Sequence, residues 1–148
     1  MVGDCASLRG GLGRLARLDL PTLRAAWWTL RAVRRARSDT RRRPVHSIRL
    51  PPAPRLPARS SRGVGAVLGV GSYTCLEQAT VRQSWLLAQG HPRDLIIGVR
   101  PGARGYEAHA WLEGDSPGTD LERPFVELLR KSALSTELPV GRLPSTTQ

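Results

Sequence analysis

Residues 74–113 constrain the fold most, because they predict a capped helix followed at once by a β-hairpin. Thr74 and Glu77 match the capping box, in which each side chain accepts a hydrogen bond from the other residue's backbone N–H. The helix that this motif begins is predicted over residues 75–89, and Gly90 is its stop signal. Because a helix beside a hairpin must bury one face against it, the sequence predicts an α+β fold.

The hairpin consists of two predicted strands, residues 95–100 and residues 106–113, which are separated by a Pro- and Gly-containing turn. Successive side chains of a strand point to opposite faces of its sheet. In the second strand Ala110 and Leu112 therefore belong to the core face. The other face carries the polar and aromatic residues Glu107, His109, Trp111 and Glu113.

A third strand is predicted to begin near Asp120, although Pro124 limits its pairing. An antiparallel strand adjacent to residues 106–113 would bring Asp120 beside the His109 imidazole. Asp115 is closer to His109 in sequence but lies in the turn. The hairpin geometry therefore favours Asp120 over Asp115 as the carboxylate that orients the imidazole, and Asp115 stays the second candidate.

Positive charge is concentrated in residues 1–62, which contain 15 Arg and 3 Asp, whereas the remainder contains 8 Lys or Arg and 9 Asp or Glu. The sequence therefore predicts a basic N-terminal helix and an Arg/Pro-rich linker over residues 1–62. The compact domain is predicted over residues 63–138, with a tail over residues 139–148.

The predicted N-terminal helix spans residues 20–37 and has apolar residues at three- and four-residue spacing. These residues would form its buried face: Leu23, Ala26, Trp27, Leu30 and Val33. Residues 40–63 contain an Arg41–Arg43 run and five prolines, which argues against a helix and for an extended charged linker. The small apolar residues 63–71 are expected to approach other backbone closely.

The sequence predicts no cofactor. His46, His91 and His109 show no metal-ligand spacing, and no Gly-rich Lys-Ser/Thr phosphate loop occurs. Cys5 and Cys75 are expected to be free thiols in a reducing compartment. Neither a membrane-spanning segment nor a secretory signal is predicted. We therefore expect a cytoplasmic protein, with peripheral attachment to the inner membrane surface as an option.

Cys75 stands at the first position of its predicted helix. The free N–H groups and the helix dipole at that position stabilise an anion such as a thiolate. Cysteine is also a common small core residue, so position alone does not decide between the two roles. Cys75 at a helix start, His109 on a nearby strand and a carboxylate after it are the components of a cysteine nucleophile site.

Several spaced blocks of the sequence, over roughly residues 64–130, agree in order with one known family. They resemble the lasso peptide leader peptidases, which are transglutaminase-like bacterial cysteine peptidases of ribosomal peptide biosynthesis. The resemblance implies that Cys75 is the nucleophile, His109 the general base and then acid, and Asp120 the orienting carboxylate. The matching blocks are Cys75-Leu76-Glu77-Gln78-Ala79, Trp85-Leu86-Leu87 with Gly90, Ile96-Ile97-Gly98-Val99-Arg100, and Tyr106-Glu107-Ala108-His109-Ala110-Trp111-Leu112-Glu113.

The same resemblance implies partners. In this family a winged-helix leader-recognition domain is either fused ahead of the peptidase or supplied as a separate small protein. Residues 1–62 contain one predicted helix and no set of strands, so the chain resembles the split form. The implied partners are a precursor leader peptide, a separate recognition protein and an ATP-dependent macrocyclase.

An alternative hypothesis is a non-catalytic basic adaptor. The Arg-rich residues 31–62 suit nucleic acid, an anionic membrane or a biosynthetic partner. Aromatic residues do not interleave with the Arg cluster, and no nucleic-acid-binding module follows it, which makes nucleic acid the least favoured of these. Cys75 discriminates between the hypotheses, because an enzyme needs its sulfur and an adaptor does not.

Overall fold

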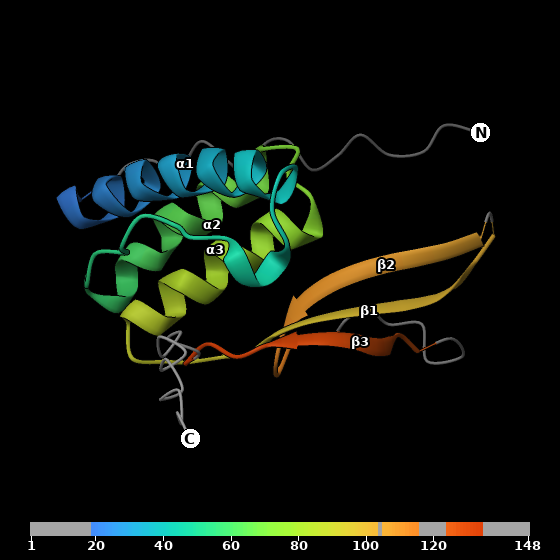
Figure 1. Cartoon of the computed structure of the whole chain (residues 1–148). Helices are drawn as coiled ribbons and strands as arrows, with labels where there is room; N and C mark the ends of the chain where they lie inside the picture. The colour runs from blue at the N-terminus through green and yellow to red at the C-terminus, as the bar shows by residue number, and fades with distance from the viewer. Residues whose placement is uncertain (1–18, 104, 116–123, 135–148) are drawn as a thin grey trace, which may run out of the picture.

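The computed structural model describes residues 19–103, 105–115 and 124–134. Its fold is α+β: three helices pack together, and a three-stranded antiparallel sheet extends from one side of them (Figure 1). Short 3-10 turns, η2 (Val45–Ser47) and η3 (Ala58–Ser60), lie between the first two helices. The main elements are α1 (Leu20–Thr40), α2 (Ser61–Val70), α3 (Cys75–Ala88), β1 (Leu95–Gly102), β2 (Gly105–Leu112) and β3 (Val126–Lys131).

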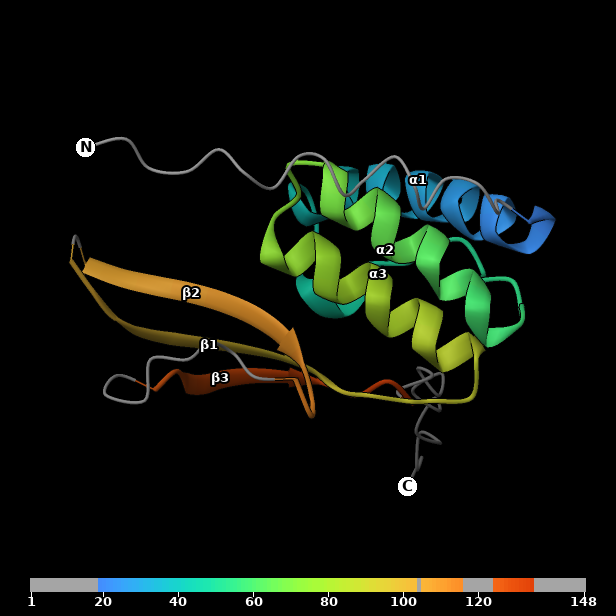
Figure 2. The same ribbon diagram turned by 180° about the vertical axis from the view of Figure 1, so that it is seen from behind.

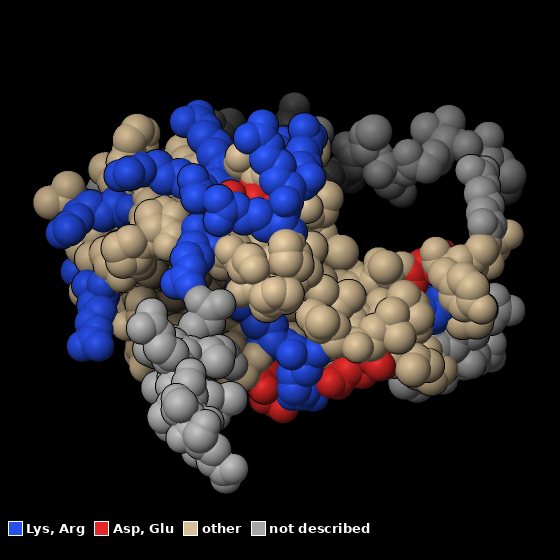
Figure 3. All heavy atoms as spheres, viewed as in Figure 1, with Lys and Arg blue, Asp and Glu red and all other residues tan. Residues whose placement is uncertain are grey.

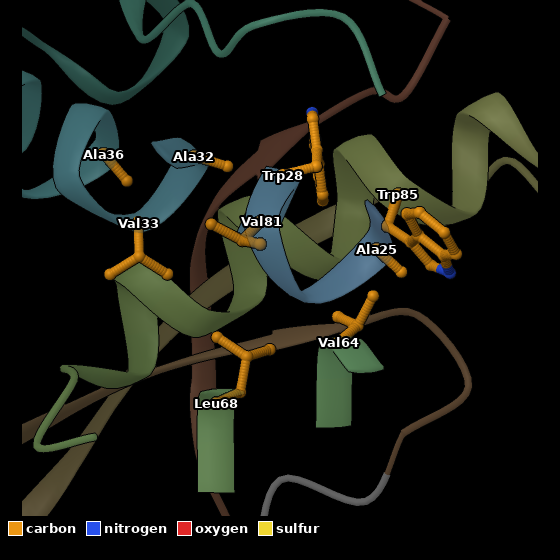
Figure 4. Packing of buried hydrophobic residues seen from close by; sticks show 9 residues of the cluster. All are labelled: Ala25, Trp28, Ala32, Val33, Ala36, Val64, Leu68, Val81 and Trp85. Atoms are coloured by element: carbon orange, nitrogen blue, oxygen red, sulfur yellow. The ribbon is translucent and has the colours of Figure 1, made fainter. Parts of the chain in front are cut away.

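The buried face of α1 differs from the one that the sequence predicts. Leu23 and Trp27 are 47% and 62% exposed, whereas Trp28 is buried and packs on Trp85 with 5.6 Å between ring centroids. Most of the other buried positions of α1 are small, which allows α2 and α3 to approach closely. The core that the three helices share consists of Ala25, Trp28, Ala32, Val33, Ala36, Val64, Leu68, Val81 and Trp85 (Figure 4).

Helix α2 forms where the sequence predicts only a close backbone approach. Its three glycines weaken intrinsic helix propensity, so the burial of Val64 and Leu68 supplies much of its stability. The expected close approach is confirmed at Gly63, where a Cβ atom would overlap the backbone carbonyl of Thr22. α1 and α2 therefore touch backbone to backbone at this point.

Gly63→Ala is expected to destabilise the protein by about 1–3 kcal/mol, because the added methyl group forces α1 and α2 apart. Gly65→Ala is the matched control: it lies in the same helix, and no atom lies within 4 Å of the position that its new methyl group would take. It should be neutral or stabilising by up to about 1 kcal/mol, through helix propensity alone. Urea unfolding measures both, and equal effects would contradict the close packing.

The Pro-rich segment after α1 is packed against the helices instead of spanning free solvent. Its prolines exclude a regular helix or strand, as predicted, but Ile48 is buried. The indole N–H of Trp28 donates to the Pro51 carbonyl (3.1 Å), and Leu56 N–H donates to the Gln89 side chain (3.2 Å). The linker prediction failed here because the apolar residues between the prolines have a core within reach.

The sheet has the strand order β2-β1-β3. β1 and β2 form the predicted hairpin, in which Gly98 pairs with His109. β3 pairs with β1, on the side away from β2. α3 packs against the sheet through a second buried cluster, made of Ala79, Leu95, Ala110 and Leu112. Among the described residues, no helix has the length and apolar character needed to cross a membrane.

Candidate functional site

Cys75 is the first residue of α3, as the capping box predicts. Thr74 Oγ1 accepts a hydrogen bond from the Glu77 N–H (3.2 Å), and Glu77 Oε2 accepts one from the Thr74 N–H (3.0 Å). The Cys75 side chain is half-buried and packs against the cluster that joins α3 to the sheet. The thiol therefore lies at the positive end of a well-capped helix and beside the hairpin.

Arg37 of α1 holds this helix start in place. Its Nε lies 3.1 Å from Glu77 Oε1, and its Nη2 donates to the Ser72 carbonyl (2.7 Å). The guanidinium also lies over the Tyr73 ring, 5.6 Å from its centroid. The sequence counts Arg37 only as part of the basic surface, because no local pattern links residues 40 positions apart. The structure makes it the residue that joins α1 to the Cys75 loop.

Arg37→Gln is expected to cost about 1–2 kcal/mol of stability, because the Glu77 carboxylate is only 5% exposed and loses its cation. Arg34→Gln is the control on the same helix, and it should stay within about 0.5 kcal/mol. A double-mutant cycle with Glu77→Gln, read by urea unfolding, should show coupling between Arg37 and Glu77. Additive effects would contradict a pairwise interaction.

His109 lies on β2 in an aromatic environment. Its ring stacks on Trp111, with 6.0 Å between centroids, and lies 5.4 Å from the Phe125 ring. Ala110 and Leu112, which alternate with these residues, are buried. The predicted division of this strand into a core face and a polar, aromatic face is therefore confirmed at these positions.

Cys75 and His109 approach β2 from its two faces. α3 packs against the face of Ala110 and Leu112, whereas the His109 ring lies on the face of Trp111. Both views of the ribbon show α3 beside the end of β2 (Figures 1 and 2). Among the described residues, no hydrogen bond joins the thiol to the imidazole. The structure brings both residues to one strand, and their catalytic pairing stays a prediction.

Asp120 lies outside the described residues, so its role also stays a prediction. The described strand after the turn, β3, pairs with β1 and not with β2, whereas the sequence prediction placed the third strand beside β2. His109 of β2 pairs with Gly98 of β1, and Gly98 in turn pairs with Glu127 of β3. Within the described residues, β1 therefore separates the third strand from the strand of His109.

Asp115 is engaged elsewhere. Arg93 donates to its Oδ1 (3.2 Å), and Arg82 of α3 approaches its Oδ2 at 2.8 Å as an ion pair outside hydrogen-bonding geometry. Its backbone N–H donates to the Leu112 carbonyl (2.9 Å). Asp115 thus fastens the end of the hairpin to α3, which is a structural role.

Charged groups surround the aromatic residues on the His109 face. The Arg100 guanidinium lies 4.6 Å from the Phe125 ring centroid and pairs with Glu107 at 2.9 Å. Arg130 pairs with Glu113 at 2.8 Å, and hydrogen bonds to Glu127 and Glu113 raise the Arg130 pKa above its ordinary value. Sequence reasoning missed Phe125, because its approach to His109 depends on where the third strand joins the sheet.

Two further features bear on cofactors and ligands. An open hollow of about 450 Å³ lies between α2 and α3, and neither Cys75 nor His109 lines it. Within residues 19–103, 105–115 and 124–134, no group of three His, Cys, Asp or Glu side chains is placed to hold a metal ion.

Comparison with known proteins gives the family. A model of the transglutaminase-like superfamily matches residues 16–130. The match runs from before α1 to the penultimate residue of β3, so it includes α1 and the Pro-rich segment as well as the Cys75 helix. The chain matches no curated protein and no solved structure. Because the family model covers most of the chain, the protein belongs to the transglutaminase-like superfamily.

Proposed function

We propose that this protein is a cysteine peptidase that removes the leader from a ribosomally made lasso peptide precursor before macrocyclisation. The observation that carries the proposal is Cys75 at the first position of α3, with both hydrogen bonds of the capping box formed. Membership of the transglutaminase-like superfamily supports it, and so does the resemblance of the Cys75 and His109 blocks to leader peptidases.

In this reaction the Cys75 thiolate attacks the carbonyl carbon of the leader–core junction, and a C–S bond forms. His109, which takes the thiol proton, gives it to the departing amine as the C–N bond breaks. That amine is the new N-terminus of the core peptide. Water then hydrolyses the thioester and releases the leader with a free carboxylate. The Cys75 backbone N–H at the helix start is suited to stabilise the oxyanion.

The proposal requires the imidazole to reach the thiol in the substrate complex. In the structure the two side chains lie on opposite faces of β2, so their pairing requires the end of β2 or the His109 side chain to move when substrate binds. Catalytic hydrogen bonds are often long or poorly aligned until substrate binds. Asp120 is the proposed orienting carboxylate, on the resemblance alone.

The proposed partners follow from the family layout. The described part of residues 19–62 contains α1 and two 3-10 turns and no strand, so it lacks a winged-helix recognition unit. A separate recognition protein would present the leader to the peptidase. An ATP-dependent macrocyclase would then consume the core peptide with its new N-terminus.

We expect the purified chain alone to cleave its precursor slowly, and addition of the cognate recognition protein to restore cleavage. Peptide masses recorded over time identify the cut and its rate. The matched control replaces the precursor with one whose leader sequence is scrambled. Equal rates with and without the recognition protein would contradict the split arrangement. No cleavage under any of these conditions would refute the peptidase.

The alternative proposal is a non-catalytic basic adaptor, and the exposed arginines of α1 favour it. An adaptor would bind its partner equally well without the Cys75 sulfur. Binding that survives Cys75→Ala in a protein that never cleaves precursor would support this alternative.

A further inference from the structure

The solvent-facing side of α1 combines large apolar and basic side chains. Its apolar members, Leu20, Leu23 and Trp27, are 70%, 47% and 62% exposed. The basic members are exposed as well. Spacings of three and four residues place all of them along one side of the helix. We call this set the outer stripe of α1: Leu20, Leu23, Arg24, Trp27, Arg31 and Arg34.

The residues of the outer stripe do not contribute to the buried core that α1 shares with α2 and α3. The opposite side of α1, with Trp28 and the alanines, supplies the core. Arg35 and Arg37 are paired with Asp39 and Glu77. The structure gives the stripe's own arginines no ion pair within its described part. Three arginines that form no ion pair with any described residue, beside an exposed Trp, favour an anionic partner with an apolar component.

The shape of this surface narrows the choice of partner. α1 lies at the outside of the helical layer in both ribbon views (Figures 1 and 2). Lys and Arg side chains gather over this part of the molecule (Figure 3). The hollow between α2 and α3 is lined by other residues. A convex helix with Trp, Leu and Arg on one side suits a flat surface better than an extended peptide, which binds in a groove.

We propose that the outer stripe docks α1 onto an anionic phospholipid membrane, with the helix axis parallel to the membrane surface. Trp27, Leu20 and Leu23 would enter the boundary between headgroups and acyl chains. The arginines would bind lipid phosphates while their aliphatic stems follow the apolar side chains inward. Nucleic acid would use the same cations but would gain nothing from the exposed Leu and Trp. This docking is independent of the peptidase proposal.

Co-sedimentation with phosphatidylglycerol/phosphatidylcholine vesicles tests the proposal on the full chain. Each Arg near an anionic surface contributes about fivefold to partitioning, so Arg31→Gln/Arg34→Gln should weaken binding roughly 30-fold. Arg55→Gln/Arg62→Gln removes two exposed charges from outside α1 and should bind nearly as well as the unmodified chain. Phosphatidylcholine vesicles should bind little protein.

Trp27 tests the apolar part of the contact. Trp27→Ala should weaken vesicle binding roughly tenfold, because less apolar area is buried. Val70→Ala, at a residue of α2 that is 90% exposed, should leave it unchanged. The blue shift of tryptophan emission on vesicles should disappear in Trp27→Phe. Circular dichroism checks that each of these surface variants is folded.

Four results would overturn the proposal. The first is no binding to anionic vesicles. The second is equal losses in the α1 and control charge variants, which would show only an effect of net charge. The third is full binding by Trp27→Ala, which would show adsorption without insertion. The fourth is binding of single-stranded RNA by a chain that ignores vesicles, which would assign the stripe to nucleic acid.

Discussion

Cys75→Ala is expected to abolish leader cleavage and to leave the fold intact. Loss of an attacking nucleophile costs on the order of 10⁶-fold in turnover in enzymes of this kind. The structural cost is small, because Thr74 and Glu77 cap α3 and the half-buried thiol contributes one heavy atom to the packing. Single-turnover cleavage in the presence of the recognition protein, followed by peptide mass, measures the loss.

Cys75→Ser and Cys5→Ala complete this experiment. Serine keeps the shape of the side chain but replaces a thiol by a far weaker nucleophile, so it should be inactive as well. Cys5 lies outside the described residues, and its replacement should preserve cleavage. Near-normal cleavage by Cys75→Ala would end the peptidase proposal. It would leave the membrane proposal standing, because vesicle binding does not involve the thiol.

The elements that the sequence predicts well are those with local signals. The capping box places the start of α3 at Cys75, and the helix ends at Ala88, one residue before the predicted end. Alternation of small or apolar with polar residues gives the β1–β2 hairpin and its two faces. Both patterns act between residues close in sequence, so neither depends on the rest of the fold.

The predictions that failed depend on distant contacts. The buried face of α1 is the one that carries its small residues, because only small side chains leave room for α2 to approach α1 closely at Gly63. The Pro-rich segment is ordered by hydrogen bonds to Trp28 of α1 and to Gln89, which directly follows α3. Strand order is likewise a global property: residues 126–131 join the hairpin at β1, where a purely sequential arrangement would have placed them beside β2.

The candidate site shows the same division. Local sequence places Cys75 at a helix start and His109 on the polar face of a strand. Whether the thiol and the imidazole can meet depends on the twist of the sheet and on the side-chain rotamers. The spacing of residues in the sequence encodes neither of these. Arg37 was missed for the same reason, since its contact with Glu77 joins residues of two helices that are 40 positions apart in the sequence.

The two aspartates are expected to differ sharply when each is replaced by asparagine. A carboxylate that orients a catalytic imidazole fixes its tautomer and stabilises its cation, so its loss costs roughly 10⁴-fold in turnover. We expect Asp120→Asn to lose single-turnover cleavage on that scale. We expect Asp115→Asn to retain most of it, because Arg82 and Arg93 already occupy the Asp115 carboxylate.

Stability measurements make the contrast decisive. Asp115→Asn removes two ion pairs between the hairpin end and its neighbours. The free energy of unfolding should fall by about 1 kcal/mol or less, because the two arginine side chains are 46% and 44% exposed. Urea unfolding measures this loss. Asp120→Asn should slow cleavage without that loss. The reverse ranking of activities would assign the orienting role to Asp115. Two mild effects would instead show that another group orients His109. The next candidates to test would be the backbone carbonyl groups of β2 and the carboxylates of Glu107 and Glu113, because they share the strand or the face of His109.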